Sequence, residues 1–474
     1  MNRGMSGFLR DNIEAFAVAI AMALVIRHYC LEAFRIPTAS MNPTLLGKHL
    51  GPDGERLHGD RILVDKFVYL RREPRRFEVI VFRYPLNADI NFIKRLGGLP
   101  GEWLRIVDGD IWTSRDEGAS WTIQRKPPGT RDQMLFPYYP VPAHHPLVFL
   151  RMPVWRTGPG WSVDRETQRF DVDADSAMGD TELVFDRHVL PYDEVDTGND
   201  SNPPYVGDVR VSCDVSVRRA GSLTVRLTEH ARRHRLVLGP AGSYAVVARE
   251  DRDYRFPLDV RIEEGQRFRL SFANVDDTLV IDLKGDLDLH REIEFPDQPD
   301  QPPMPSMFRD DGYRTNEIAL VANGLGGTLT DLRIDRDEYY DVGGNPLRIW
   351  KIPEDCFLAL GDNTISSLDS RRWRVAEAHL KNGEVVRWDA NTREGVLNPP
   401  ARRPPGPGDP EIVVQADVDG RVRRFRRSEV ERWVPDAPYP FVPRDHLVGR
   451  AFAIFWPLYL PPINRGPTRV DLIR

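Results

Sequence analysis

Ser40 is the first residue of this chain whose setting suggests chemistry. It lies between Pro37 and Pro43 in the segment 36–45. Each proline disfavours the helical conformation for the residue before it, so Ile36 and Asn42 are expected to be extended or in a turn. A serine on such a stiff segment can hold its hydroxyl and its own N–H in fixed directions, as a nucleophile with an adjoining oxyanion donor requires. The alternative, an ordinary turn serine, stays open.

Lys94 is the residue that could act as a base for such a hydroxyl. Strand alternation over 90–96 places Ile90, Phe92 and Lys94 on one face. To be neutral near pH 7, a lysine needs its pKa lowered from about 10.4 to about 7, a preference of roughly 4.6 kcal/mol for the neutral form. Burial supplies shifts of that size. The alternative is a lysine at a strand end whose stem packs while its amine reaches water.

A third segment, 361–373, concentrates hydroxyls, one carboxylate and two guanidiniums behind the apolar run 356–360. Its first three residues, Gly-Asp-Asn, are typical of a turn. Asp369 and Arg371 are spaced to form an ion pair that braces this loop. With the loop held in place, one of its serine hydroxyls could orient the amine of Lys94.

Among the elements that could position these groups, the first along the chain is an apolar run at 15–26. A membrane-spanning helix needs about 20 apolar residues, so this run spans a bilayer only if flanking residues join it. We expect a retained transmembrane anchor within 1–34. A cleaved secretory signal and a buried core helix are the alternatives. Arginines lie on both sides of the run, at positions 3, 10, 27 and 35, so charge does not decide its orientation.

Most of the remaining chain predicts β structure, and we expect a mainly β fold. Runs rich in β-branched and aromatic residues at 61–70, 77–84 and 90–96 predict a β meander. From about 208 onward, short alternating runs between turn residues predict an inserted β-sandwich. The segment 272–285 resembles laminin-G or concanavalin-type jelly rolls. The proline-rich segment 399–410 predicts a semi-rigid linker.

Taken in order, six segments of this sequence resemble the bacterial type I signal peptidases, which are membrane-anchored serine proteases with a Ser-Lys dyad. The resemblance covers about 8–115, 346–375 and 441–460, less than half of the chain. The segments that carry it are 36–45 (IPTASMNPTL), 59–66 (GDRILVDK), 77–85 (FEVIVFRYP), 92–101 (FIKRLGGLPG), 361–373 (GDNTISSLDSRRW) and 447–451 (LVGRA).

The resemblance assigns roles to individual residues. It implies that Ser40 is the nucleophile and neutral Lys94 the base, with the Ser40 N–H and the Thr38 hydroxyl as the oxyanion hole. Ser367 would hydrogen-bond the lysine amine, and Asp369 with Arg371 would form a supporting ion pair. The family's shallow pockets for small substrate residues would be lined by Phe34, Ile36, Pro37, Met41, Phe92 and Ile93.

This sequence also departs from the family beside the supporting loop. Thr364-Ile365 stands where the family has Arg-Asp, and Arg374 stands where it has glycine. The departures put the loop's geometry in question more than the dyad itself. No family cysteine pair is evident.

These segments divide the chain into a core with two insertions. We expect the N-terminal segment with its anchor at 1–34 and the catalytic core at 35–115, 346–375 and 441–474, the last part containing a closing strand and the tail. The larger insertion would span 116–345, with the sandwich from about 208, and the smaller one 376–440.

Composition excludes some classes of function and leaves others open. The 474 residues include 65 basic and 71 acidic side chains, a formal charge of −6, which argues against nucleic acid as a partner. Three scattered cysteines and the histidine spacing predict no metal site, and we expect no cofactor. Asp276, Asp277, Asp286 and Asp288 fit no EF-hand loop and are expected to be solvated turn acids.

The function expected from the resemblance is removal of N-terminal signal peptides from exported preproteins, by cutting after small residues of Ala-x-Ala type. The partners would be signal peptides and the lipid bilayer, with a single-pass anchor in the cytoplasmic membrane and the catalytic domain outside the cytoplasm. An inactive, membrane-tethered protein that binds sugar or protein through its sandwich is the main alternative. A self-cleaving repressor with the same dyad is disfavoured by the N-terminal apolar run.

Overall fold

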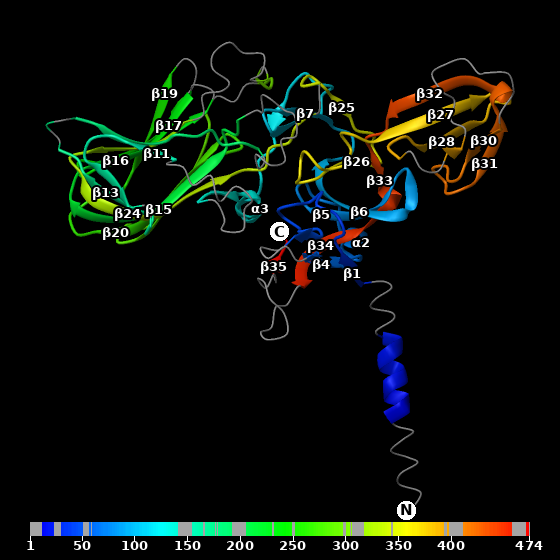
Figure 1. Ribbon diagram of the computed structural model, residues 1–474, viewed down its shortest axis with the longest axis horizontal. Coiled ribbons are helices and arrows are strands. Elements are labelled where there is room, and N and C mark those ends of the chain that lie inside the picture. Colours follow the sequence, from blue (N-terminus) through cyan, green and yellow to red (C-terminus); the bar gives the residue numbers. More distant parts are fainter. Residues whose placement is uncertain are drawn as a thin grey trace, which may run out of the picture. The chain divides into compact units, whose positions relative to one another are not determined.

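The structure is a computed structural model of the 474-residue chain. It describes residues 12–22, 30–50, 56–57, 59–140, 154–164, 166–175, 177, 179–191, 205–229, 232–248, 252–296, 300–303, 305, 317–342, 345–392, 396–397, 411–456 and 471–473. The chain divides into two compact units, which are considered separately below (Figure 1). Unit 1 comprises Met1–Glu102 and Lys351–Arg474, and unit 2 comprises Trp103–Trp350.

The central sheet of unit 1 joins segments from both ends of the chain. Its strand order is β1-β4-β34-β5-β6-β26-β33, and β35 also pairs with β34. The C-terminal strand β34 therefore lies between two N-terminal strands. The bounds are β1 Leu31–Arg35, β4 Arg61–Asp65, β5 Val79–Tyr84, β6 Asn87–Gly98, β26 Cys356–Leu360, β33 Val442–Pro443, β34 Leu447–Trp456 and β35 Asp471–Leu472.

Alternation along β5 explains why this sheet is covered on both faces. Val79 and Val81 belong to one hydrophobic cluster, together with Ile36. Ile80 and Phe82 belong to a second cluster that includes Trp373. Because successive side chains of a strand point to opposite faces, a strand with no polar residue in this run must be buried on both sides.

The expected strand at 61–70 is wrong in its second half. Strand β4 ends at Asp65, and a short helix, α2, covers Val68–Arg71. The Asp65 carboxylate accepts hydrogen bonds from the backbone N–H groups of Phe67 and Val68, at 2.8 and 3.1 Å. An aspartate that bonds to the backbone ahead of it favours a turn and competes with the strand ladder.

The C-terminal part of unit 1 carries two further small sheets around a core of their own. One sheet has the order β28-β27-β32 and the other β29-β30-β31. The bounds are β27 Arg374–Leu380, β28 Val385–Asp389, β29 Val396–Leu397, β30 Glu411–Val414, β31 Arg423–Arg426 and β32 Val430–Pro438, with 3-10 turns at Arg427–Glu429 and Arg444–His446. The linker expected at 399–410 lies outside the described residues. A two-stranded sheet pairs β2 (His49–Leu50) with β3 (Arg56–Leu57).

Unit 2 is built mainly from two large antiparallel sheets. One has the order β12-β13-β24-β15-β20-β21-β22, with β10 paired to β24, and the other β11-β14-β23-β16-β17-β18-β19. The bounds are β10 Phe136–Tyr139, β11 Trp155–Thr157, β12 Trp161–Asp164, β13 Arg169–Asp173, β14 Thr181–Phe185, β15 Val209–Arg219, β16 Ser222–Glu229, β17 Arg232–Leu238, β18 Ser243–Ala248, β19 Asp253–Leu258, β20 Arg267–Val275, β21 Thr278–Gly285, β22 Leu289–Glu294, β23 Ile318–Asn323 and β24 Gly326–Arg336.

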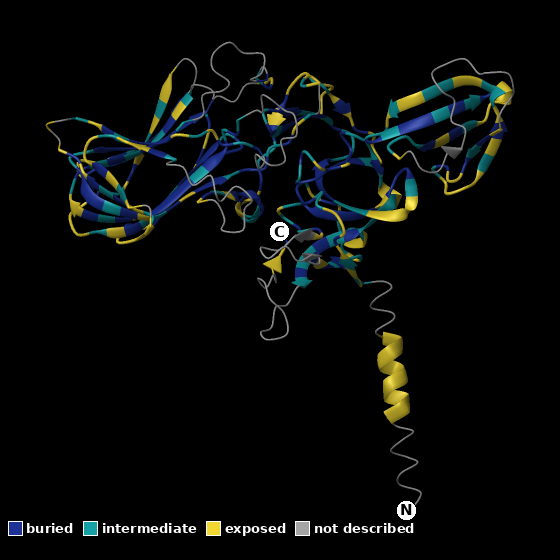
Figure 2. Ribbon diagram, viewed as in Figure 1, coloured by how far each residue is buried: buried dark blue, intermediate teal, exposed yellow. Residues whose placement is uncertain are grey.

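The two sheets of unit 2 share one hydrophobic core. Val211 and Leu270 come from the first sheet, Val225 and Leu320 from the second, and all four are buried in the same cluster. Alternating strands with one apolar face form such a two-sheet sandwich. Figure 2 shows the buried residues of both sheets in dark blue. The prediction of a mainly β fold is confirmed.

A smaller sheet, with the order β25-β7-β8-β9, accompanies the sandwich. Its bounds are β7 Trp103–Val107, β8 Asp110–Ser114, β9 Thr122–Ile123 and β25 Trp350–Lys351, and the helix α3 spans Pro128–Met134. The hairpin between β7 and β8 turns through Asp108 and Gly109, with φ values of 51° and 98°. Two successive positive φ values are typical of the tight turn that joins two such strands.

The expectation of solvated turn acids is wrong for Asp276. This residue lies at the turn between β20 and β21 but is only 2% exposed. Its carboxylate accepts hydrogen bonds from the backbone N–H of Lys126, at 2.9 Å, and from Lys126 Nζ, at 2.5 Å. Because Lys126 is distant in sequence, local turn patterns gave no indication of this burial.

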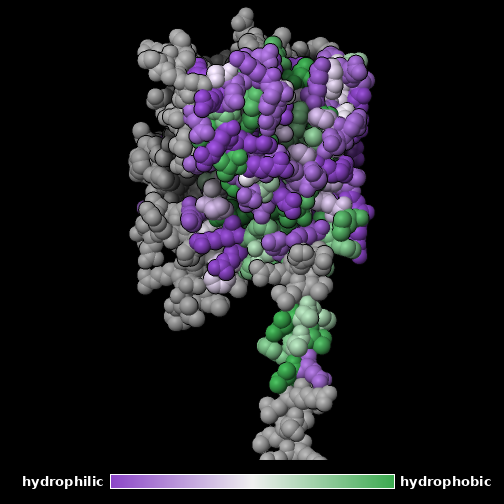
Figure 3. All heavy atoms as spheres, turned by 90° about the vertical axis from the view of Figure 1, so that its right-hand side faces the viewer, coloured by the Kyte–Doolittle hydropathy of each residue, from purple (hydrophilic) through white to green (hydrophobic). Residues whose placement is uncertain are grey.

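The N-terminal helix covers 12–22 in the described part of the chain, whereas the apolar run in the sequence continues to residue 26. Residues 23–29 lie outside the described residues. Within the described residues, the structure contains no helix with the length and apolar character needed to cross a bilayer. All eleven residues of the helix are exposed, including Ile13, Phe16 and Met22 (Figure 2). Apolar side chains cover much of its visible surface in Figure 3.

Candidate active site

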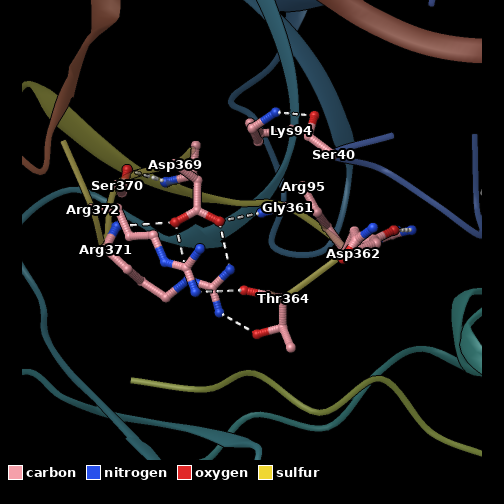
Figure 4. A network of polar contacts seen from close by, with 12 residues as sticks. Ser40, Lys94, Arg95, Gly361, Asp362, Thr364, Asp369, Ser370, Arg371 and Arg372 are labelled. Atoms are coloured by element: carbon pink, nitrogen blue, oxygen red, sulfur yellow. Dashed lines mark hydrogen bonds and ion pairs between the residues drawn. The ribbon is translucent and has the colours of Figure 1, made fainter. Parts of the chain in front are cut away.

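Ser40 and Lys94 lie in contact although 54 positions separate them. The distance between Lys94 Nζ and Ser40 Oγ is 2.7 Å (Figure 4). Lys94 lies on β6 directly opposite Ile80 of β5. Ser40 lies in the turn that follows Ile36, whose backbone N–H donates to the carbonyl of Asp60 at 2.9 Å. Strand β6 therefore holds the Lys94 amine, and a turn hydrogen-bonded to the residue before β4 presents the Ser40 hydroxyl.

The surroundings of Lys94 shift its protonation equilibrium toward the neutral form. The residue is 3% exposed, and its Nζ also contacts the carbonyl oxygen of Ile93 at 2.9 Å. Burial lowers the pKa of Lys94 to about 8, although the carboxylates of Asp369 and Asp362 act in the opposite direction. A neutral amine has a lone pair that can accept the proton of a hydroxyl at hydrogen-bond distance.

The hydroxyl of Thr38 lies on the exposed side of Ser40. Thr38 Oγ1 is 3.4 Å from Ser40 Oγ, and Thr38 itself is exposed. Ser40 is half-buried, whereas Lys94 is buried. The two hydroxyls and the buried amine thus lie close together.

Ser367 is close to this group but does not make the expected hydrogen bond. Its side chain is 1% exposed, and its Oγ has no hydrogen-bond partner among the described residues. It lies against Gly361, where a Cβ atom would come within 2.0 Å of Ser367 Oγ and within 2.6 Å of the Ser40 carbonyl oxygen. Because Gly361 has no side chain, the segment that contains Ser40 and the segment that contains Ser367 can approach each other here.

Asp369 and Arg371 form a buried ion pair that closes the loop after β26. Arg371 Nη2 and Nε lie 2.5 and 2.9 Å from the two carboxylate oxygens of Asp369, which also accept the backbone N–H groups of Gly361 and Arg371. Burial acts to raise the pKa of Asp369, but the guanidinium and the two N–H donors hold it below its usual value. Both partners are at most 2% exposed in their side chains.

One of the departures from the family contributes to this loop. Arg371 Nη1 donates to the Thr364 hydroxyl oxygen at 2.6 Å. The side chain of Arg372 donates to the carbonyl oxygens of Thr364 and Ile365. Thr364 is buried and takes part in the network drawn in Figure 4. The loop geometry that the sequence left in question is therefore ordered around this threonine.

A second buried ion pair was missed by the sequence analysis. Arg95 Nη2 and Nε lie 2.6 and 2.9 Å from the carboxylate of Asp362, and both side chains are at most 1% exposed. The Thr44 hydroxyl donates to the same carboxylate at 2.5 Å. Lys94 and Arg95 are adjacent on β6 and point to opposite faces. A second basic residue inside an apolar strand was the feature of the sequence that could have indicated this ion pair.

Comparison with known proteins finds a family similarity over the segment that contains Ser40 and Lys94. Residues 9–128 match a family model described as signal peptidase, peptidase S26. The matched segment contains both Ser40 and Lys94. Over residues 9–128, the chain is therefore similar to the signal peptidase family.

Three relatives each match part of the chain. Signal peptidase I of Aquifex aeolicus is 48% identical over 84 residues, which are 18% of this chain and 28% of the relative. Signal peptidase I of Pseudomonas aeruginosa is 38% identical over 129 residues, 25% of this chain and 42% of the relative. Signal peptidase I of Rickettsia prowazekii is 34% identical over 113 residues, which are 22% of this chain and 43% of the relative. The chain thus spans less than half the length of these relatives.

Solved structures also resemble part of the chain. A carbohydrate-binding module of Bacillus subtilis is 11% identical, with a TM-score of 0.25, and the match covers 39% of this chain and 97% of that one. A toad ovary galectin is 12% identical, with a TM-score of 0.19, and the match covers 27% of this chain and 88% of that one. Similarities this weak indicate neither a ligand nor a function.

The residues expected to contact substrate differ in accessibility. Phe34, Ile36, Met41 and Ile93 pack in one hydrophobic cluster, and Met41 and Ile93 directly adjoin Ser40 and Lys94 in the sequence. Ile36 and Met41 are 3% and 1% exposed, so they form the buried floor of this cluster. Phe34 and Ile93 are half-buried. Pro37 is exposed.

Phe92 is separated from the other apolar residues. It belongs to the second cluster of unit 1 and stacks on Tyr84, with ring centroids 4.3 Å apart. Lys94 Nζ lies 5.3 Å from the centre of the Phe92 ring. Phe92 therefore packs beside the base and on the opposite side of β6 from Ile93.

Proposed function

We propose that this protein is a signal peptidase I that removes signal peptides from exported preproteins with a Ser40–Lys94 dyad. The observation that carries the proposal is the 2.7 Å contact between Ser40 Oγ and the buried amine of Lys94. The family match over residues 9–128 supports it. A conventional Ser-His-Asp mechanism has no support, because the basic side chain at hydrogen-bond distance from the serine hydroxyl is a lysine.

In the proposed mechanism, neutral Lys94 takes the proton from Ser40 Oγ as this oxygen attacks the scissile carbonyl carbon. The C–N bond then breaks, and the ammonium of Lys94 passes its proton to the leaving amine. The acyl group remains esterified to Ser40. Water, activated by the neutral amine, attacks the ester and releases the signal peptide with a free carboxylate.

Two donors are proposed to stabilise the oxyanion that forms during both steps. One is the backbone N–H of Ser40 and the other is the hydroxyl of Thr38, which lies 3.4 Å from Ser40 Oγ. Loss of one oxyanion donor typically lowers the rate by about 10²–10³-fold. Ser367, Asp369 and Arg371 are proposed to support the amine by holding the loop after β26 in place.

Preference for small residues is proposed to come from the apolar surface beside the dyad. Phe34 and Ile93 would contact the substrate directly, while Ile36 and Met41 form the floor beneath them. Pro37 would keep the preceding segment extended, and Phe92 would pack against the base. A larger substrate side chain would meet this packed floor and force it out of place, which is costly in a close-packed core.

Replacement of Lys94 by alanine tests the dyad. The full chain, in detergent, is incubated with a preprotein that carries an Ala-x-Ala site, and the new N-terminus of the product is sequenced. We expect Lys94→Ala to lose cleavage by at least about 10³-fold, since a general base typically contributes 10²–10⁴-fold. Lys66→Ala is the matched control, because Lys66 pairs with Glu32 at 3.1 Å, away from the dyad.

Several results would contradict the proposal. Equal cleavage by the Lys94→Ala variant would exclude the dyad. Cleavage by the wild type at sites without small residues would exclude the proposed specificity. A wild-type protein that folds but cuts no preprotein would favour the alternative function, a tethered binding protein with an inactive core.

We also propose that the N-terminal segment anchors the chain in the cytoplasmic membrane, with both units outside the cytoplasm. The support is the exposed apolar surface of helix 12–22, which water solvates poorly. The full chain is expected to co-sediment with phospholipid vesicles, whereas a chain lacking residues 1–29 is expected to stay in the supernatant. Co-sedimentation of both forms, or of neither, would contradict this anchor.

A further inference from the structure

Unit 2 contains a group of carboxylates that come from widely separated segments of the chain. Carboxylate oxygens of Asp110, Asp208 and Asp276 all lie within 4.8 Å of one another. Asp337 adjoins them and is 1% exposed. We call these four residues the acidic cluster. They come from β8, from the residue before β15, from the turn after β20 and from the residue after β24, so only the folded unit brings them together.

The polar contacts of the acidic cluster are few for its charge. Lys126 Nζ pairs with Asp276 at 2.5 Å and with Asp337 at 2.6 Å. Asp208 accepts the side-chain amide of Asn274 at 3.1 Å and the backbone N–H of Asp276 at 2.7 Å. The same amide nitrogen donates to Glu229 at 3.1 Å. In the described part of unit 2, neither Asp110 nor Asp208 forms a salt bridge with a lysine or arginine.

Charge in the acidic cluster is therefore out of balance. Four carboxylates face one lysine, and Glu229 adds a further carboxylate at the edge. Burying unpaired charges costs several kcal/mol per ion, so such a group must gain either protons or another cation.

Two buried oxygen atoms provide a second, independent observation. Asn274 Oδ1 and Asp337 Oδ1 have no hydrogen-bond partner in the described part of the chain, and their residues are 0% and 1% exposed. Both side chains are held within the group, Asn274 by Asp208 and Asp337 by Lys126. Buried acceptors of this kind are rare in folded proteins, and each calls for a partner such as an ordered water or an ion.

We propose that the acidic cluster, together with Asn274, binds one Ca²⁺ ion. Calcium takes six to eight oxygen ligands from carboxylates, amide oxygens and water at about 2.3–2.6 Å, in flexible geometry. The cluster offers carboxylate and amide oxygens and no thiolate. The sequence analysis predicted no metal site because the ligands are spread over 228 positions, from Asp110 to Asp337, and follow no loop motif.

The ion would stabilise unit 2 by joining elements that are distant in the chain. Asp110 belongs to the β7–β8 hairpin, whereas Asp208, Asp276 and Asp337 belong to strand ends of the sandwich. A ligand that binds only the folded form shifts unfolding by mass action. At a Ca²⁺ concentration 100 times the dissociation constant, the unfolding constant of unit 2 is expected to fall about 100-fold.

The test uses the full chain, stripped of metal with EDTA and transferred to chelator-free buffer. Calorimetric titration with CaCl₂ is expected to show one site per chain, and the melting temperature is expected to rise with Ca²⁺. Asp110→Asn and Asp208→Asn are expected to lose both effects. Asp288→Asn is the matched control and should keep both, because Asp288 is an exposed acid in the same unit.

The wild-type titration decides the question even if the cluster variants fail to fold. Absence of binding heat at millimolar Ca²⁺, with an unchanged melting temperature, would overturn the proposal and leave protons as the neutralising charge. Retention of both effects in Asp110→Asn and Asp208→Asn would place calcium elsewhere and would equally overturn it. Cleavage of preprotein does not enter either measurement, so failure here is separable from failure of the peptidase proposal.

Discussion

At the scale of single residues, the proposed chemistry depends on the protonation of one amine. A lysine in water is charged near neutral pH and cannot accept a proton. Burial lowers the pKa of Lys94 to about 8. At pH 7 roughly one tenth of the amine is then neutral, which suffices for a base 2.7 Å from its hydroxyl.

The pH dependence of cleavage follows from this value. Since the neutral amine is the active form, kcat/KM should rise about tenfold per pH unit from pH 6 and level off above about pH 8. The profile is measured with a soluble signal-peptide substrate that has no group titrating in this range. A profile that is flat from pH 6 to 9, or that falls, would contradict a neutral lysine base.

At the scale of elements, β6 carries two basic residues with different partners. Lys94 contacts Ser40, and Arg95 pairs with Asp362. The Asp362 carboxylate also accepts the hydroxyl of Thr44, and the carbonyl of Ser40 accepts the backbone N–H of Asn363 at 3.2 Å. The strand, the serine turn and the loop after β26 are therefore held together by polar contacts around one buried carboxylate.

Removal of this carboxylate should destabilise unit 1. Asp362→Ala leaves the guanidinium of Arg95 buried without its partner, which typically costs about 3–5 kcal/mol. The free energy of unfolding is measured by urea titration, and cleavage activity is expected to fall as well because the serine turn loses a contact.

Asp436→Ala serves as the matched change in this unit, since Asp436 pairs with Arg374 at 3.3 Å and is 61% exposed in its side chain. Exposed pairs contribute about 0–1 kcal/mol. Equal losses of stability in the two variants would mean that the buried pair does not hold these elements together.

At the scale of the whole molecule, the proposed catalytic residues all lie in unit 1, and unit 2 interrupts that unit at one place. The chain leaves after Glu102 and returns at Lys351. The residues at this junction are neighbours, because the N–H of Ile352 donates to the carbonyl of Glu102 at 2.9 Å. The ends of unit 1 are therefore already close enough for a short connection.

Excision of residues 103–350 and their replacement by a short Gly-Ser linker should leave unit 1 folded. Cleavage of a short signal-peptide substrate is expected to stay within about threefold of the full chain, because short linkers close such gaps at little entropic cost. The calcium effect should disappear with unit 2. Loss of folding in the excised chain, seen by circular dichroism, would show that unit 1 depends on the insertion.

Local patterns in the sequence were sufficient for much of the fold, whereas the Ser40–Lys94 dyad was expected from the family resemblance and stays a prediction. Alternation over 90–96 put Ile90, Phe92 and Lys94 on one face; Lys94 Nζ lies 5.3 Å from the centre of the Phe92 ring, whereas Ile90 is 47% exposed. The mainly β class followed from β-branched and aromatic runs. Strand ends were less certain, because a single hydrogen-bonding side chain such as Asp65 ended β4 early.

The sequence by itself determined which residues could react, because residue type, strand alternation and proline stiffness are local properties. Only the tertiary structure decided which charges meet. Arg95 pairs with Asp362 across 267 positions, and Asp276 is buried against Lys126 across 150. The cost of a buried charge depends on every group around it, and those groups arrive from distant segments when the chain folds.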